Sequence, residues 1–86
     1  MNGRALVAWN LRRVRVLQGI SQEKLAADAS VDRAYVGGLE RQEENPTVDL
    51  LDRIAEALSV SITDFFIRPK AGEKPPATLR KGRKKK

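Results

Sequence analysis

The sequence predicts an all-α fold, with one small helical domain followed by a basic tail. Apolar side chains recur every three or four residues in several segments, and no run shows the strict alternation of a half-buried β-strand. Ser, Thr or Asp stands just before several of these segments, where its side-chain oxygen can accept from free backbone amides at a helix start. The chain has 86 residues, enough for one small core. We expect five helices within residues 1–67.

The first two helices are expected at about residues 4–18 and 22–29. The apolar side chains of the first helix fall within one arc, as a core-facing stripe should. They are Leu6, Val7, Leu11, Val14 and Leu17. Gly19 supplies the left-handed residue that commonly ends a helix. Ser21 is placed to cap the second helix. The residues of this helix that face inward are Leu25, Ala26 and Ala29.

The third helix, about residues 33–41, contains two adjacent glycines, Gly37 and Gly38. Together they should cost about 2 kcal/mol of helix stability relative to alanine. Helical spacing places them on the outward face, together with Arg33, Ala34 and Arg41. Small residues flanked by guanidinium groups can let a helix backbone lie close to a phosphate-lined groove. Alternatively, surface glycines are merely tolerated because the opposite face packs well.

The fourth and fifth helices follow a turn at residues 45–47. Thr47 caps the fourth, about residues 48–58, which is strongly amphipathic. Its inward stripe is Val48, Leu51, Ile54, Ala55 and Leu58. Ser61 caps the short fifth helix, and Asp64 stands three residues later, at the capping-box spacing.

Residues 68–86 are predicted to form a disordered basic tail, because they carry little apolar surface to bury. They hold nine Lys and Arg against one Glu, whereas residues 1–67 hold eight Lys and Arg against ten Asp and Glu. The sequence pI of about 10.2 therefore belongs to the tail. Six of its positive charges lie in residues 80–86, where they are either phosphate contacts or a solvated end.

The composition argues against several classes of function. The chain has no Cys and no His, which removes thiolate metal sites, disulfides and the commonest general base. We therefore expect no catalytic activity, no metal and no cofactor, and no small-molecule ligand is evident. The longest apolar run near the N-terminus, residues 5–9, is far too short for a signal sequence or a membrane span. These observations favour a cytoplasmic protein without a membrane partner.

Short motifs stand at fixed offsets through residues 19–58. They are Ser21-Gln22-Glu23, Leu25-Ala26, Val31, Tyr35-Val36, Leu39-Glu40-Arg41, Asn45-Pro46, Leu51, Ile54-Ala55 and Leu58. This arrangement resembles the XRE-family helix-turn-helix of phage repressors, Cro proteins and restriction–modification controller proteins. With the first and fifth helices included, the resemblance covers residues 4–67. It implies a compact five-helix, lambda-repressor-like domain with its helix-turn-helix at about residues 21–41.

The resemblance implies a sequence-specific transcriptional regulator that inserts helix 33–41 into the major groove of double-stranded DNA. The implied DNA-binding residues are Ser21, Gln22, Arg33, Ala34, Tyr35, Gly37, Gly38 and Arg41. Arg33 is the candidate for a bidentate guanine contact. Because so few of these side chains can bond to bases, we expect specificity to rest on Arg33, on the methyl group of Ala34 and on DNA shape.

The resemblance also assigns structural roles. Arg15 and Glu40 fall where members of the family often form an ion pair between the first and third helices. Gln42 and Ser59 stand where the family often has glycine, at helix ends where a left-handed residue other than glycine costs up to about 1 kcal/mol.

Phe65, Phe66 and Ile67 are too apolar to be left exposed at the end of a domain. They either pack on the fourth helix or contribute to a dimer interface. We expect a homodimer on a palindromic operator, the usual arrangement of helix-turn-helix proteins. The alternative function is a protein-interaction module, either an antitoxin or a coactivator-like adaptor, that uses the same fold.

Overall fold

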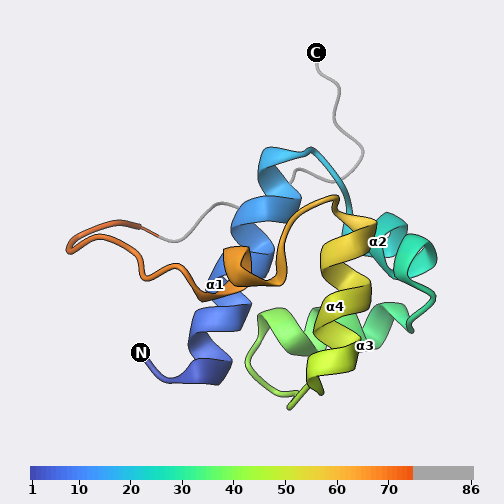
Figure 1. Ribbon diagram of the computed structural model, residues 1–86, viewed down its shortest axis with the longest axis horizontal. Coiled ribbons are helices and arrows are strands. Elements are labelled where there is room, and N and C mark those ends of the chain that lie inside the picture. Colours follow the sequence, from blue (N-terminus) through green and yellow to red (C-terminus); the bar gives the residue numbers. More distant parts are fainter. Residues whose placement is uncertain (75–86) are drawn as a thin grey trace.

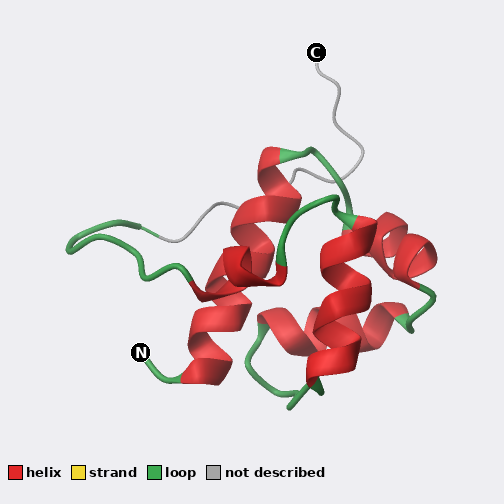
Figure 2. Ribbon diagram, in the orientation of Figure 1, coloured by secondary structure: helices red, strands yellow, loops and turns green. Residues whose placement is uncertain are grey.

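The computed structural model describes residues 1–74, and every regular element in that part of the chain is helical (Figure 1, Figure 2). The elements are α1 (Gly3–Leu17), α2 (Gln22–Ala29), α3 (Arg33–Glu40), α4 (Val48–Ala57) and the 3₁₀-helix η1 (Ile62–Phe66). The prediction of an all-α fold is confirmed, and the α-helices begin and end within one residue of their predicted bounds. The fifth helix is a short 3₁₀ turn rather than an α-helix.

The helices enclose one core to which every element contributes. α1 packs against α3 and η1, and α2 packs against α3 and α4. In Figure 1, α4 lies in front of α3, with α1 on one side and α2 on the other, while the η1 turn lies against α1. The largest fully buried side chains are Leu11, Leu25, Val36, Leu39, Ile54, Leu58, Phe65 and the polar Asn10. Because α3 is held from two sides, only its remaining face is free for another molecule.

The predicted helix caps are present. The Ser21 hydroxyl accepts from the Lys24 amide at 3.0 Å, and the Thr47 hydroxyl accepts from the Leu50 amide at 3.0 Å. Ser61 begins a complete capping box. Its hydroxyl accepts from the backbone amide of Asp64, and the Asp64 carboxylate accepts from the backbone amide of Ser61. These bonds explain why the helix starts can be read from the sequence.

A left-handed residue follows each α-helix within two positions of its end. Gly19 has φ 69°, and Ser30, Gln42 and Ser59 have φ values of 59°, 64° and 58°. After α3, the Gln42 amide donates to the Leu39 carbonyl, and the next amide donates to the Gly38 carbonyl at 2.8 Å. These two bonds define a Schellman motif. The motif reverses the chain and brings residues 43–44 back alongside α3.

Two apolar residues assigned to core stripes are exposed, so their assignment was wrong. Leu17 is the last residue of α1, and Val48 is the first residue of α4. Both are largely exposed. A stripe inferred from helical spacing assumes that neighbouring helices cover the whole length of the helix, and here the packing stops short of these terminal positions.

Asn10 is fully buried on α1, in a role that no sequence pattern predicts. Its side-chain amide nitrogen lies 3.0 Å from the Leu6 carbonyl oxygen, 3.0 Å from that of Phe65 and 2.8 Å from that of Ile67. One side chain thus satisfies backbone carbonyls at the end of η1 that are far away in the sequence. It fixes the end of the domain onto α1.

We predict that Asn10→Ala lowers the free energy of unfolding by about 1–3 kcal/mol, because the buried carbonyls of η1 lose their donor. Urea denaturation followed by circular dichroism measures this change. Asn45→Ala is the matched control, since Asn45 is exposed, and it should unfold close to wild type. Equal unfolding midpoints for the two variants would contradict the assigned role.

Candidate nucleic-acid interface

α2 and α3 form two short helices joined by a tight turn at residues 30–32. They pack directly on each other, and α3 then runs behind α4 toward α1 (Figure 1). Asp32 caps α3 by accepting from the Ala34 amide at 3.1 Å. The first turn of α3 therefore starts at the surface, with Arg33 and Ala34 exposed. This is the geometry of a helix-turn-helix whose second helix can enter a groove.

The opposite face of α3 anchors it in the core. Val36 and Leu39 are buried, and Tyr35 is half-buried against the core cluster. Burial raises the pKa of the Tyr35 phenol, and the negative charge of Glu44 raises that pKa further. Like any tyrosine at neutral pH, Tyr35 keeps a hydroxyl that can donate a hydrogen bond. Its predicted DNA contact remains a proposal.

The two glycines of α3 do not form the open surface that helical spacing predicted. Both are buried beneath polar side chains. A Cβ atom built on Gly37 would lie 3.0 Å from Arg41 Nη1 and 3.6 Å from Gln22 Oε1. A Cβ atom built on Gly38 would lie 2.8 Å from Glu44 Cγ. Because the glycines have no side chains of their own, side chains from α2 and from the residues that follow α3 can lie on the helix backbone.

Glu40, at the end of α3, joins the first three helices. Its carboxylate accepts from Arg15 Nε at 2.6 Å and from Arg15 Nη2 at 2.9 Å. It also accepts from Gln22 Nε2 at 3.1 Å, and Arg12 Nε lies 3.5 Å away. The Arg15 and Glu40 side chains are only 3% and 1% exposed. This buried network fixes α3 relative to α1 and α2, so the exposed face of α3 has a fixed orientation.

Two predicted DNA-binding side chains are engaged within the protein. The Gln22 amide nitrogen is held by Glu40, and the Ser21 hydroxyl caps α2. The sequence pattern gave no indication of the Gln22–Glu40 bond, or of Arg12 as a further cation beside Glu40. Contacts of Ser21 and Gln22 with DNA remain proposals, and they would use the remaining hydrogen-bonding capacity of each group.

Arg41 follows the last residue of α3 and is exposed at the surface. Its Nη2 lies 3.1 Å from Glu43 Oε1. The hydrogen bond from Arg41, together with its positive charge, lowers the pKa of the Glu43 carboxyl. Because both partners are exposed, the pair is easily exchanged for another anion. A phosphate that took the place of Glu43 would meet the same guanidinium.

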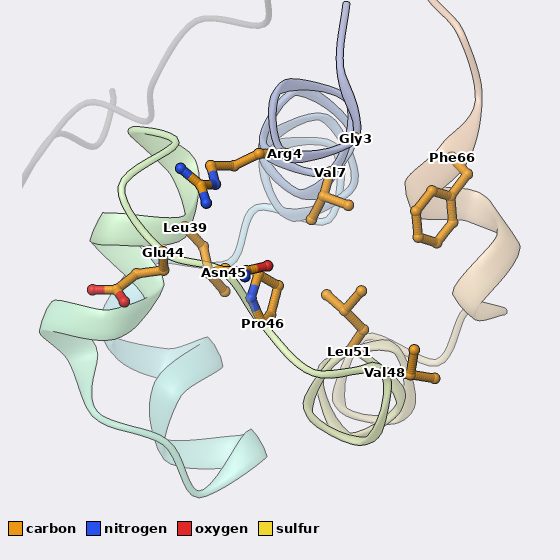
Figure 3. Close-up of a pocket in the computed structure, with 10 residues that line it drawn as sticks. All are labelled: Gly3, Arg4, Val7, Leu39, Glu44, Asn45, Pro46, Val48, Leu51 and Phe66. Atoms are coloured by element: carbon orange, nitrogen blue, oxygen red, sulfur yellow. The ribbon is translucent and has the colours of Figure 1, made fainter.

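The candidate dimer residues fall into two groups. Phe65 is completely buried, so its assignment to a dimer interface was wrong: it packs in the core of its own chain. Phe66 and Ile67 are 46% and 48% exposed. Phe66 borders an open, mostly apolar pocket between α1, residues 44–46 and α4, with Val7 and Leu51 on its walls (Figure 3). These two exposed side chains remain candidates for contact with a second copy.

Within residues 1–74, no cluster of three or more potential metal-binding His, Cys, Asp or Glu side chains is present. In the same part of the chain, no helix is long and apolar enough to cross a bilayer. The predicted tail contacts of residues 80–86 lie outside the described residues.

A model of the helix-turn-helix family HTH_3 matches residues 11–65. This chain belongs to that family. The match spans α2, α3 and α4 and ends within η1. It confirms the resemblance to XRE-type regulators that the motifs of residues 19–58 indicated.

Among curated proteins, the chain is similar to a hypothetical transcription factor of Neisseria meningitidis, with 38% identity over 66 residues. That alignment spans 77% of this chain and 62% of the relative, so it leaves more than a third of the relative unmatched. The chain is also similar to the control protein C.SmaI of Serratia marcescens, with 35% identity over 79% of this chain and 81% of the relative.

Solved structures show the same fold. The Neisseria transcription factor superposes with a TM-score of 0.76 at 37% identity, covering 79% of this chain and 78% of that one. The controller protein C.Esp1396I, solved as a tetramer with its natural 35 base-pair operator, superposes with a TM-score of 0.71 at 33% identity. That match covers 77% of this chain and 87% of the other. Together, fold, family and relatives identify a DNA-binding transcriptional regulator of the helix-turn-helix class.

Proposed function

We propose that this regulator reads DNA by placing α3 in the major groove, as a homodimer on a palindromic operator. The observation that carries the proposal is the fixed, exposed start of α3, which the buried Arg15–Glu40 pair orients. The operator complex of the relative C.Esp1396I supports it. The comparisons favour this function over the alternative of a protein-interaction module.

Within this proposal, the exposed residues of α3 have distinct roles. Arg33 donates two guanidinium hydrogen bonds to O6 and N7 of a guanine, and the Ala34 methyl group contacts a thymine methyl. Arg41, Ser21 and Gln22 hold the phosphate backbone beside the groove. The Tyr35 hydroxyl is a further donor at the edge of α3, and Gly37 leaves room for the Arg41 and Gln22 side chains that lie over its backbone.

The proposed dimer forms through the exposed apolar side chains after α4. Phe66 and Ile67 are candidates because burying their exposed apolar surface against a second copy would stabilise the dimer. A dimer presents two copies of α3, and the spacing of the two half-sites should be about one helical turn of DNA. Because a regulator that binds operator DNA must reach the chromosome, we also propose that the protein works in the bacterial cytoplasm.

We predict that Arg33→Ala removes the preference for one guanine in each half-site and weakens operator binding by about 1–3 kcal/mol per contact. Selection of bound duplexes from a random pool, with wild type and variant in parallel, measures both effects. Arg4→Ala is the matched control, because Arg4 is an exposed arginine on α1, and it should keep the full consensus. No enrichment by the wild type, or an unchanged consensus with Arg33→Ala, would contradict the proposal.

A further inference from the structure

We propose that Glu44, seated on Gly38, reads a base in the major groove and is a specificity-determining residue. The inference rests on the proposed function, because it requires that α3 enter the groove. It replaces the expectation that α3 is nearly bare beyond Arg33. The carboxylate reaches this face from the loop that follows α3.

Glu44 occupies the space that a side chain at position 38 would fill. A Cβ atom on Gly38 would lie 2.8 Å from Glu44 Cγ, 2.9 Å from Oε2 and 3.3 Å from Cδ. Real Cβ atoms essentially never approach a neighbour below 3.0 Å, so any other residue at position 38 would displace the Glu44 side chain. Glycine at position 38 therefore leaves a space on the surface of α3, which we call the Gly38 seat, and the Glu44 side chain fills it from the loop after the helix.

The turn after α3 explains how Glu44 reaches that seat. Gln42 adopts a left-handed conformation with φ 64°, and the Glu43 amide then donates to the Gly38 carbonyl at 2.8 Å. The chain is thus bonded back onto α3 one residue before Glu44. In Figure 3 the Glu44 side chain points away from the apolar pocket walls formed by Val7 and Leu51.

The carboxylate is available for an external partner. The ion pairs formed within residues 1–74 engage the carboxylates of Asp28, Glu40 and Glu43, and not that of Glu44. Glu44 is partly exposed and carries enough charge to raise the pKa of Tyr35. It lies where a side chain at position 38 would begin, and glycine offers no side-chain donor there.

The chemistry of a carboxylate limits what it can recognise. An ionised carboxylate only accepts hydrogen bonds, and the phosphate backbone offers no donor. In the major groove, the donors are the N4 amine of cytosine and the N6 amine of adenine. Cytosine is the usual partner of Glu, so we assign Glu44 the recognition of a cytosine amine. The expected position is separate from that of Arg33, which begins α3.

The test is selection from a random duplex pool with wild type, Glu44→Ala and the control Glu43→Ala. Both variants lose one negative charge from adjacent positions, so a general electrostatic effect appears in both. We expect the wild type to enrich cytosine at one position in each half-site. Glu44→Ala should lose that preference by roughly 5- to 150-fold and keep the Arg33 position, whereas Glu43→Ala should keep both.

A second pair of variants tests the seat itself. Gly38→Ala adds a methyl group where Glu44 lies, and Gly37→Ala adds one where the flexible end of Arg41 lies. Both changes favour helix formation, so neither should prevent folding. Gly38→Ala should reduce the same cytosine preference as Glu44→Ala, and Gly37→Ala should leave that preference intact.

The outcomes separate the two proposals. A consensus that keeps the cytosine preference in Glu44→Ala overturns the role of Glu44 and leaves the proposed function standing. Equal, sequence-independent changes in Glu44→Ala and Glu43→Ala overturn it too, because they report charge alone. If the wild type enriches no consensus, the proposed function fails, and the role of Glu44 fails with it.

Discussion

Replacing Glu40 by alanine should lower the free energy of unfolding by about 3–5 kcal/mol, a large part of the stability of a small domain. The variant leaves the Arg15 guanidinium buried, at 3% exposure, without its bidentate partner. The Gln22 amide loses its acceptor at the same time. Because this carboxylate joins α1, α2 and α3, the variant should also bind DNA more weakly than its stability alone explains.

Urea denaturation at neutral pH measures the change. Glu43→Ala is the matched control, since Glu43 pairs with Arg41 at an exposed site and its loss should leave the unfolding midpoint close to wild type. The double variant Arg15→Met with Glu40→Leu should regain part of the lost stability, because it removes the buried charge together with its partner. A Glu40→Ala midpoint equal to that of Glu43→Ala would show that the buried pair does not hold the helices together.

Phe65→Ala should lower the free energy of unfolding by about 3–5 kcal/mol. Phe65 is completely buried within one chain, so the loss should be the same at low and high protein concentration. Its neighbour Phe66 is 46% exposed, and Phe66→Ala should change the stability of the monomer far less. The two adjacent phenylalanines thus separate core packing from the proposed association of two copies.

Thermal unfolding over a hundredfold range of protein concentration, together with sedimentation, measures both variants. We expect a concentration-independent loss of stability for Phe65→Ala and a weaker dimer for Phe66→Ala. A Phe65→Ala defect that disappears at high concentration would place Phe65 in the interface after all. Unchanged association of Phe66→Ala would remove that residue from the proposed dimer surface.

The helices could be predicted because their signals are local. Ser21, Asp32, Thr47 and Ser61 each cap the helix that follows them, and these bonds join residues two or three positions apart. Helical spacing also identified most of the core. It failed at Leu17 and Val48, because spacing alone does not show where the neighbouring helix ends.

The missed features depend on tertiary contacts or on the path of the chain. The Asn10 side chain bonds to the Phe65 carbonyl 55 residues away, and no local pattern reveals such a partner. The place of Glu44 over Gly38 depends on the chain reversal at Gln42, and the left-handed residue expected there does not by itself show which side chain will lie over the glycine. The Arg15–Glu40 pair was expected only from family resemblance, since the two residues are 25 positions apart.

Methylation interference on a selected operator shows whether α3 reads the major groove. Methylation of guanine N7 blocks the major groove, whereas methylation of adenine N3 blocks the minor groove. We predict that N7 methylation abolishes binding at one guanine in each half-site, and that this interference disappears with Arg33→Ala. Interference confined to adenine N3, or N7 interference that is the same in wild type and Arg33→Ala, would contradict it.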